Sequence, residues 1–147
     1  MTLNVYLSGE IHSTWREEIA DGIAKAGLSV TLTAPVTNHE ASDNCGVNIL
    51  GEETNDFWKD HKAAKLNVIR TRNAIQSADI VVVRFGEKHR QWNAAFDAGY
   101  AVALGKSLIV LHDPKLTHPL KEVDATAMAV AEHPEQVVSI LEYVLQK

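Results

Sequence analysis

The chain has 147 residues, and its net charge of −5 argues against a general affinity for nucleic acid or for anionic membranes. Its single cysteine, Cys45, excludes an intrachain disulfide, and no apolar run approaches the roughly 18 residues of a membrane-spanning helix. The length predicts one domain, residues 1–147. The first apolar run is too short for a signal peptide, so we expect the protein in the cytoplasm.

Short β-rich runs alternate with helical patterns along the chain. The pattern predicts strands at Leu3–Leu7, Leu28–Thr33, Ile80–Phe85, Ser107–Leu111 and Thr126–Ala131. It predicts helices at Thr14–Ala26, Lys59–Ser77, Trp92–Leu104 and Pro134–Leu145, with Leu66, Ile69, Asn73 and Ile75 near the buried side of the second helix. The polar stretch Thr37–Asp56 has no periodicity, which predicts a loop that acts as a mobile lid over a substrate.

This alternation is typical of an α/β fold, and five strands favour a flavodoxin-like, doubly wound parallel sheet in the order 2-1-3-4-5. Ligands bind such sheets at the carboxyl ends of the strands, where the strand order reverses. Here the reversal lies between the first and third strands, which are followed by "SGEIH" (Ser8–His12) and "RFGEKHRQWN" (Arg84–Asn93). Asp97, the only charge in an otherwise apolar helix, is expected near the first turn of that helix, on the ligand edge.

Three stretches carry a family resemblance: "VYLSGEI", "IQSADIVVV" and "FDAGYAVALGKSLIVL". Together they resemble the nucleoside 2-deoxyribosyltransferase superfamily, and within it the YtoQ family, which is also similar in "SGEIH" and "HPLKEVDA". The superfamily has a Tyr-Leu-(Ala/Ser)-Gly run at the end of its first strand. A later helix carries Glu-x-Gly-Tyr-Ala, followed by Gly-Lys.

The resemblance implies a catalytic carboxylate at Asp97. In the deoxyribosyltransferases the matching glutamate attacks the anomeric carbon of a nucleoside and forms a covalent sugar–enzyme intermediate. Asp97 is shorter than this glutamate by one methylene, and Thr71 stands where the family often has an aspartate. The alternative is that Asp97 only stabilises the helix through its dipole.

The loop after the first strand provides the second group of candidates. Glu10 could be a second carboxylate that assists the departing base, because glycosidic cleavage uses such a pair. It could equally cap the first helix, and His12 could donate a proton or be a polar cap. The matched run also makes Tyr6, Ser8 and Gly9 candidates for substrate binding.

Three further residues are candidates for substrate contacts. Arg84 follows the buried run "IVVV", and at that strand end it could hold a phosphate or carboxylate. Trp58 and Trp92 are placed to flank the crevice, where a nucleobase could stack on them, although Trp92 could instead pack under its helix.

Cofactors and metals are not expected. The glycines form neither G-x-G-x-x-G nor a phosphate-binding loop, and the scattered His, Asp and Cys of the polar stretch match no zinc spacing.

The sequence therefore predicts a protein that binds a nucleoside or nucleotide and hydrolyses or transfers at its N-glycosidic bond. A non-catalytic sensor of such a ligand and a structural oligomer with an inert pocket remain as alternatives. The superfamily resemblance further implies a homo-oligomer.

Overall fold

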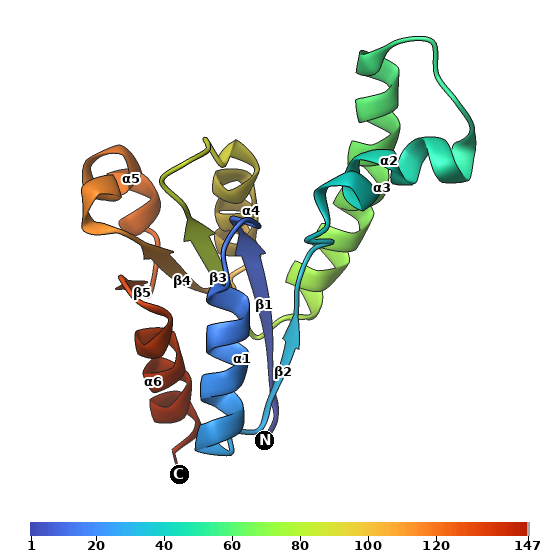
Figure 1. The fold of residues 1–147 in the computed structure, drawn as a ribbon. Coiled ribbons are helices and arrows are strands. Elements are labelled where there is room, and N and C mark those ends of the chain that lie inside the picture. The colour runs from blue at the N-terminus through green and yellow to red at the C-terminus, as the bar shows by residue number, and fades with distance from the viewer. Residues whose placement is uncertain (147) are drawn as a thin grey trace.

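The computed structural model describes residues 1–146, which form a five-stranded, all-parallel sheet with helices on both faces (Figure 1). The strand order is β2-β1-β3-β4-β5, which confirms the predicted flavodoxin-like topology. The strands are β1 Leu3–Gly9, β2 Val30–Thr33, β3 Ile80–Phe85, β4 Ser107–His112 and β5 Ala129–Ala131.

Side chains of β1, β3 and β4 alternate between two hydrophobic clusters, one on each face of the sheet. Leu7 and Val82 belong to the cluster covered by α1 (Trp15–Ala26) and α6 (Pro134–Leu145). Tyr6 and Val81 belong to the cluster covered by α4 (Trp92–Ala103) and the end of α3 (Asp56–Ser77). The β3 run "IVVV" is buried throughout because it lies in the centre of the sheet.

The prediction of a loop at Thr37–Asp56 is wrong, because His39–Leu50 forms the helix α2. Asn38 begins this helix by accepting a hydrogen bond from the Ala41 backbone amide at 2.8 Å. Only Gly46 and Val47 of α2 are buried, so the helix lacks the apolar periodicity by which sequence patterns are recognised.

The α2 and α3 helices pack on each other and together project from the sheet as an arm (Figure 1). We call residues 39–77 the arm. Because most of α3 faces solvent, Ile69 and Asn73 are exposed and not buried as expected, whereas Ala63 and Ile75 are buried. The α3 helix also begins three residues earlier than predicted, where the Asn55 side chain accepts from the Trp58 amide at 3.1 Å.

The carboxyl-terminal part contains two short helices that the sequence pattern did not predict, η1 (Pro114–Leu116) and α5 (Thr117–Asp124). A buried histidine at the end of β4 anchors α5: His112 Nε2 lies 3.0 Å from Asp124 Oδ2. Within residues 1–146, no helix is both long enough and apolar enough to cross a membrane.

Candidate functional site

A cavity of about 660 Å³ opens at the carboxyl edge of the sheet, beside the reversal of strand order between β1 and β3. One wall comes from the core of the fold: Ser8–His12 at the end of β1 and in the loop after it, His89–Gln91 before α4, and residues of α4 itself. The other wall comes from the segment after β2 and from the arm: Pro35, Val36, His39, Ser42, Asp43, Asp60, Ala63, Ala64, Asn67, Val68, Thr71 and Arg72. The cavity thus lies between the sheet and the arm, where the fold class predicts a ligand.

Asp97 lines this cavity, but it lies in the second turn of α4 and not in the first as expected. Its carboxylate is half-buried and accepts a 2.6 Å hydrogen bond from the hydroxyl of buried Ser8. Burial raises the pKa of Asp97, and the hydrogen bond from Ser8 partly offsets that rise. Within residues 1–146 no Lys, Arg or His lies within ion-pair distance of Asp97.

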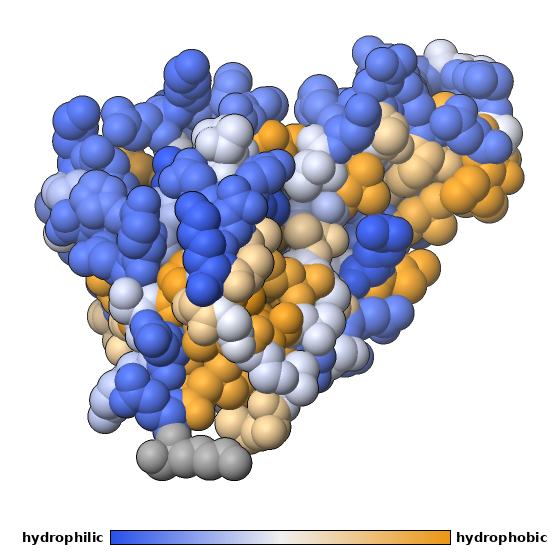
Figure 2. Space-filling view, turned by 60° about the horizontal axis from the view of Figure 1, so that its bottom comes forward, coloured by the Kyte–Doolittle hydropathy of each residue, from blue (hydrophilic) through white to orange (hydrophobic). Residues whose placement is uncertain are grey.

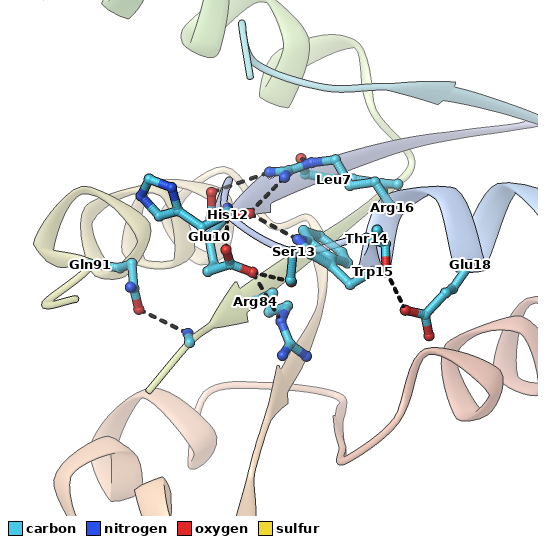
Figure 3. A network of polar contacts seen from close by, with 12 residues as sticks. Leu7, Glu10, His12, Ser13, Thr14, Trp15, Arg16, Glu18, Arg84 and Gln91 are labelled. Carbon is cyan, nitrogen blue, oxygen red and sulfur yellow. Dashed lines mark hydrogen bonds and ion pairs between the residues drawn. The ribbon is translucent and has the colours of Figure 1, made fainter. Parts of the chain in front are cut away.

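Glu10 also lines the cavity, but its carboxylate is occupied by groups of its own loop (Figure 3). It accepts hydrogen bonds from the His12 backbone amide and the Ser13 hydroxyl, and Arg84 Nε lies 3.4 Å from its Oε2. Burial acts to raise the pKa of Glu10, but the two hydrogen bonds and the charge of Arg84 outweigh it and lower the pKa. Glu10 is therefore an ionised carboxylate that shapes the loop.

Arg84 does not line the main cavity. Its side chain faces a second cleft of about 270 Å³, which it shares with Ser13 and Glu87 on the other face of the sheet. The reason is the alternation of β3: Arg84 has the same direction as Val82, towards α1 and α6. Ser8 on β1 has the direction of Tyr6, towards α4, which brings it to Asp97.

Gly9 lies where the chain turns from β1 into the loop. Its φ is +106°, and a Cβ added there would lie 2.1 Å from the carbonyl oxygen of Arg84. A side chain would therefore push β1 and β3 apart at the edge of the cavity, which explains the glycine of the Tyr-Leu-Ser-Gly run.

Arg16 is a residue of the site region that sequence reasoning missed. Its buried guanidinium donates to the carbonyl oxygens of Leu7 at 3.0 Å, Gly9 at 3.2 Å and Glu10 at 2.6 Å (Figure 3). These bonds satisfy the backbone where β1 ends, so Arg16 fixes the loop that lines the cavity. The only signal in the sequence was a charge beside Trp15 at the start of an amphipathic helix.

Tyr6 lies beneath the cavity and does not line it, since its side chain is only 1% exposed. Burial raises the pKa of its phenol, a hydrogen bond with Thr71 lowers it, and the negative charge of Asp97 raises it again. The phenol therefore lies close to both positions at which this chain departs from the superfamily pattern.

Of the two tryptophans predicted to flank the crevice, only Trp92 lines the cavity. Trp92 lines the cavity and is 72% exposed, so it does not pack under the helix. Trp58 is outside the cavity lining and is half-exposed on the arm, in contact with Phe57 and His61 at ring-centroid distances of 5.0 and 5.6 Å.

Three histidines also line the cavity: His12, His39 and His89. His12 is a predicted site residue, and His39 lies in the stretch that was expected to be a lid. The segments that carry His12 and His89 were expected at the same edge of the sheet, but nothing in the sequence indicated that His39 would join them. Among residues 1–146, no group of His, Cys, Asp and Glu is arranged to hold a metal ion.

Comparisons with known proteins agree with this description. The family model described as "Nucleoside 2-deoxyribosyltransferase YtoQ" matches residues 6–145. The protein named "Uncharacterized protein YtoQ" of Bacillus subtilis (strain 168) is 44% identical over 146 residues, which cover 99% of each chain.

Two solved structures share the fold at low identity. A conserved protein from Enterococcus faecalis V583 superposes with a TM-score of 0.67 at 12% identity, covering 99% of this chain and 100% of that one. A 2-deoxyribosyltransferase from Bacillus psychrosaccharolyticus gives 0.54 at 18% identity, covering 94% and 95%. With the family match over nearly the whole length and the 44% identity to its Bacillus subtilis relative, the chain belongs to the nucleoside 2-deoxyribosyltransferase YtoQ family.

Proposed function

We propose that this protein binds a nucleoside or nucleotide and cleaves or transfers its N-glycosidic bond, with the carboxylate of Asp97 acting at the anomeric carbon. One observation carries the proposal: Asp97 is a half-buried carboxylate on the cavity wall, held by the neutral hydroxyl of Ser8 and by no cation among residues 1–146. Family membership supports the same chemistry.

The chemistry follows from this environment. The Asp97 carboxylate attacks the anomeric carbon, or stabilises the positive charge that develops on the sugar, while the bond to the base breaks. The base leaves with the electron pair of that bond and takes up a proton from solvent water. Water or a second base then forms the new bond to the anomeric carbon, loses its own proton to solvent, and displaces the Asp97 carboxylate. Burial weakens the hydration of this carboxylate and so makes it a better nucleophile.

Glu10 has a different role in this proposal. Its lowered pKa keeps it ionised at neutral pH, so it has no proton to give to a departing base. It instead holds the Ser8–His12 loop through Ser13 and places its own negative charge at the cavity, where a positively charged sugar would form.

The test is a panel of nucleosides and nucleotides in which free base is detected chromatographically. We expect at least one substrate to release base. Asp97→Asn is expected to lose about a thousandfold or more of that rate, because the amide keeps the shape but is no nucleophile. Asp21→Asn, an exposed carboxylate on α1, is the matched control and should keep the parent rate.

A second variant tests whether Asp97 is a nucleophile or only stabilises its helix through the helix dipole. Asp97→Glu restores the reach of the superfamily glutamate and is expected to raise deoxyribosyl transfer. An Asp97→Asn variant that turns over an active substrate at the parent rate would rule out the proposed chemistry.

One observation favours a second candidate, a non-catalytic nucleoside or nucleotide sensor. Both departures from the superfamily pattern, at Asp97 and Thr71, line the cavity and adjoin Tyr6. A sensor would show a rise in melting temperature with a nucleoside or nucleotide but would release no base from it. A purely structural protein would show neither effect.

A further inference from the structure

Three imidazole rings meet at the solvent-facing side of the cavity. His12 comes from the β1–α1 loop, His39 is the first residue of α2, and His89 comes from the β3–α4 loop. The ring centroid of His12 lies 4.8 Å from that of His89 and 6.4 Å from that of His39. Because three distant segments bring these rings together, the cluster is a product of the folded cavity.

Further hydrogen-bond donors lie beside this cluster. Arg90 lines the cavity, with its guanidinium carbon 5.8 Å from the centre of the Trp92 ring. The α4 helix begins at the same place, and no side chain caps its first amides. Gln91, at the cap position, instead accepts from the Gly86 amide at 2.9 Å. Figure 3 shows Gln91 and His12 on the same side of Glu10, one from each loop.

Of the four carboxylates that line the cavity, Asp43 pairs with a histidine of the cluster, lying 3.3 Å from His39 at its edge. Glu10 bonds Ser13 and Arg84, and Asp97 bonds Ser8. Within residues 1–146, none of His12, His89 and Arg90 forms an ion pair.

The donor set selects the class of ligand. No group here is arranged for a metal ion among the described residues. Imidazole N–H groups, a guanidinium and backbone amides all donate hydrogen bonds, and together they suit an anion with several acceptor oxygens pointing in different directions. A phosphate monoester has three such oxygens, and the cavity volume lies within the usual range for small-molecule sites.

We propose that the cluster of His12, His89 and Arg90, with His39 at its edge, binds the phosphate of a nucleoside 5′-monophosphate, so that the substrate is a nucleotide and not a free nucleoside. The identity of the sugar and base rests on the proposed function, but the binding of phosphate does not. A second consequence concerns His12: as an anchor for phosphate, it is not the group that protonates the departing base.

The experiment is calorimetric titration at constant ionic strength with 2-deoxyribose 5-phosphate and with 2-deoxyribose, two probes that lack a base. We expect the phosphate ester to bind at least about tenfold more tightly, because charge-assisted hydrogen bonds are the strong ones. The double variant His12→Gln/His89→Gln should bind both probes equally weakly. His118→Gln, an exposed histidine on α5 outside the cavity lining, is the matched control and should keep the parent preference.

A second variant, Arg90→Gln, tests the same cluster independently of the histidines and should also reduce the preference for the phosphate ester. Equal binding of both probes by the parent protein would overturn the proposal, as would a preference that survives the double variant. A His12→Gln variant with reduced kcat and unchanged affinity for the phosphate ester would make His12 a proton donor instead.

These outcomes are separate from those of the glycosidic reaction. Asp97→Asn should retain the preference for the phosphate ester while losing turnover. Selective binding of the phosphate ester by a parent protein that releases no base from any substrate would support the phosphate site and contradict the proposed reaction.

Discussion

Ser8 and Asp97 form the contact on which the proposed chemistry depends. The hydroxyl of Ser8 is 1% exposed and 2.6 Å from the Asp97 carboxylate, so it restrains both the position and the ionisation of this group. In the proposed reaction the hydroxyl of Ser8 is a positioning group, since it holds the Asp97 carboxylate.

Replacing Ser8 with alanine tests how this contact controls the ionisation of Asp97. Burial already raises the pKa of Asp97, and Ser8 opposes that rise, so Ser8→Ala raises the pKa further. The reaction needs the carboxylate, and activity is therefore lost as pH falls through this pKa. We expect the acid limb of the kcat/KM profile to move to higher pH in Ser8→Ala.

The pH profile of each variant is the measurement. Ser139→Ala, which removes an exposed hydroxyl on α6, should leave the acid limb unmoved. An acid limb of Ser8→Ala that coincides with that of the parent would show that the Ser8 bond does not control Asp97.

The direction of side chains from the strands explains which candidate residues could be foreseen. The alternation of β1 places Ser8 and Tyr6 on the α4 side, where Asp97 lies, and the sequence contained that information. The same alternation on β3 sends Arg84 to the opposite face, against the expectation that it lines the ligand crevice. A position near the end of a strand does not by itself place a side chain in the ligand crevice. Successive side chains point to opposite faces of the sheet, and the face decides which crevice the side chain enters.

The arm is the element on which sequence and structure differ most. The sheet and its covering helices followed from strong periodicity, but α2 has only two buried residues and is held by its contact with α3. Gly46 makes that contact: a Cβ added there would lie 2.5 Å from the backbone nitrogen of Ala63. A helix held by a close backbone approach leaves no apolar stripe in the sequence, which is why a loop was predicted.

A matched pair of glycine variants tests this contact. Gly46→Ala should lower the free energy of unfolding and speed hydrogen exchange in α2 and α3, because the clash with backbone outweighs the better helix propensity of alanine. Gly99→Ala on α4 meets no atom within 4 Å and should stabilise the protein by about 0.5–1 kcal/mol. Equal exchange in α2 for the parent and Gly46→Ala would contradict the role of this contact.

The molecule as a whole exposes more surface than its size requires. Its accessible surface is 8963 Å² for 16.2 kDa, whereas a compact monomer of this mass exposes about 7,500 Å². The surplus is about 1,500 Å² on one chain, more than the roughly 800 Å² that each partner contributes to a standard protein interface. Figure 2 shows hydrophobic surface on the projecting lobe, and the arm carries exposed Ile49, Leu50, Phe57 and Trp58.

We propose on this basis that the protein is a homo-oligomer in which the arm is covered by a second copy. Light scattering at micromolar concentration is expected to give the mass of two or more chains of 16.2 kDa each. The double variant Ile49→Lys/Phe57→Lys should shift the mass to that of one chain, because it places charge on the exposed apolar surface. A parent protein of one-chain mass at this concentration would count against the assembly.

The two walls of the cavity come from different segments of the chain, so each wall can be mutated without changing the other. The Asp97 carboxylate lies on α4 and its partner Ser8 on β1, whereas most of the facing wall belongs to the arm, whose two helices pack mainly on each other. On the proposed function, the reacting carboxylate and the facing wall are therefore encoded in different stretches of the gene. A library confined to the arm codons for Ser42, Asp60, Asn67 and Val68 would vary the facing wall and leave Asp97 and Ser8 untouched.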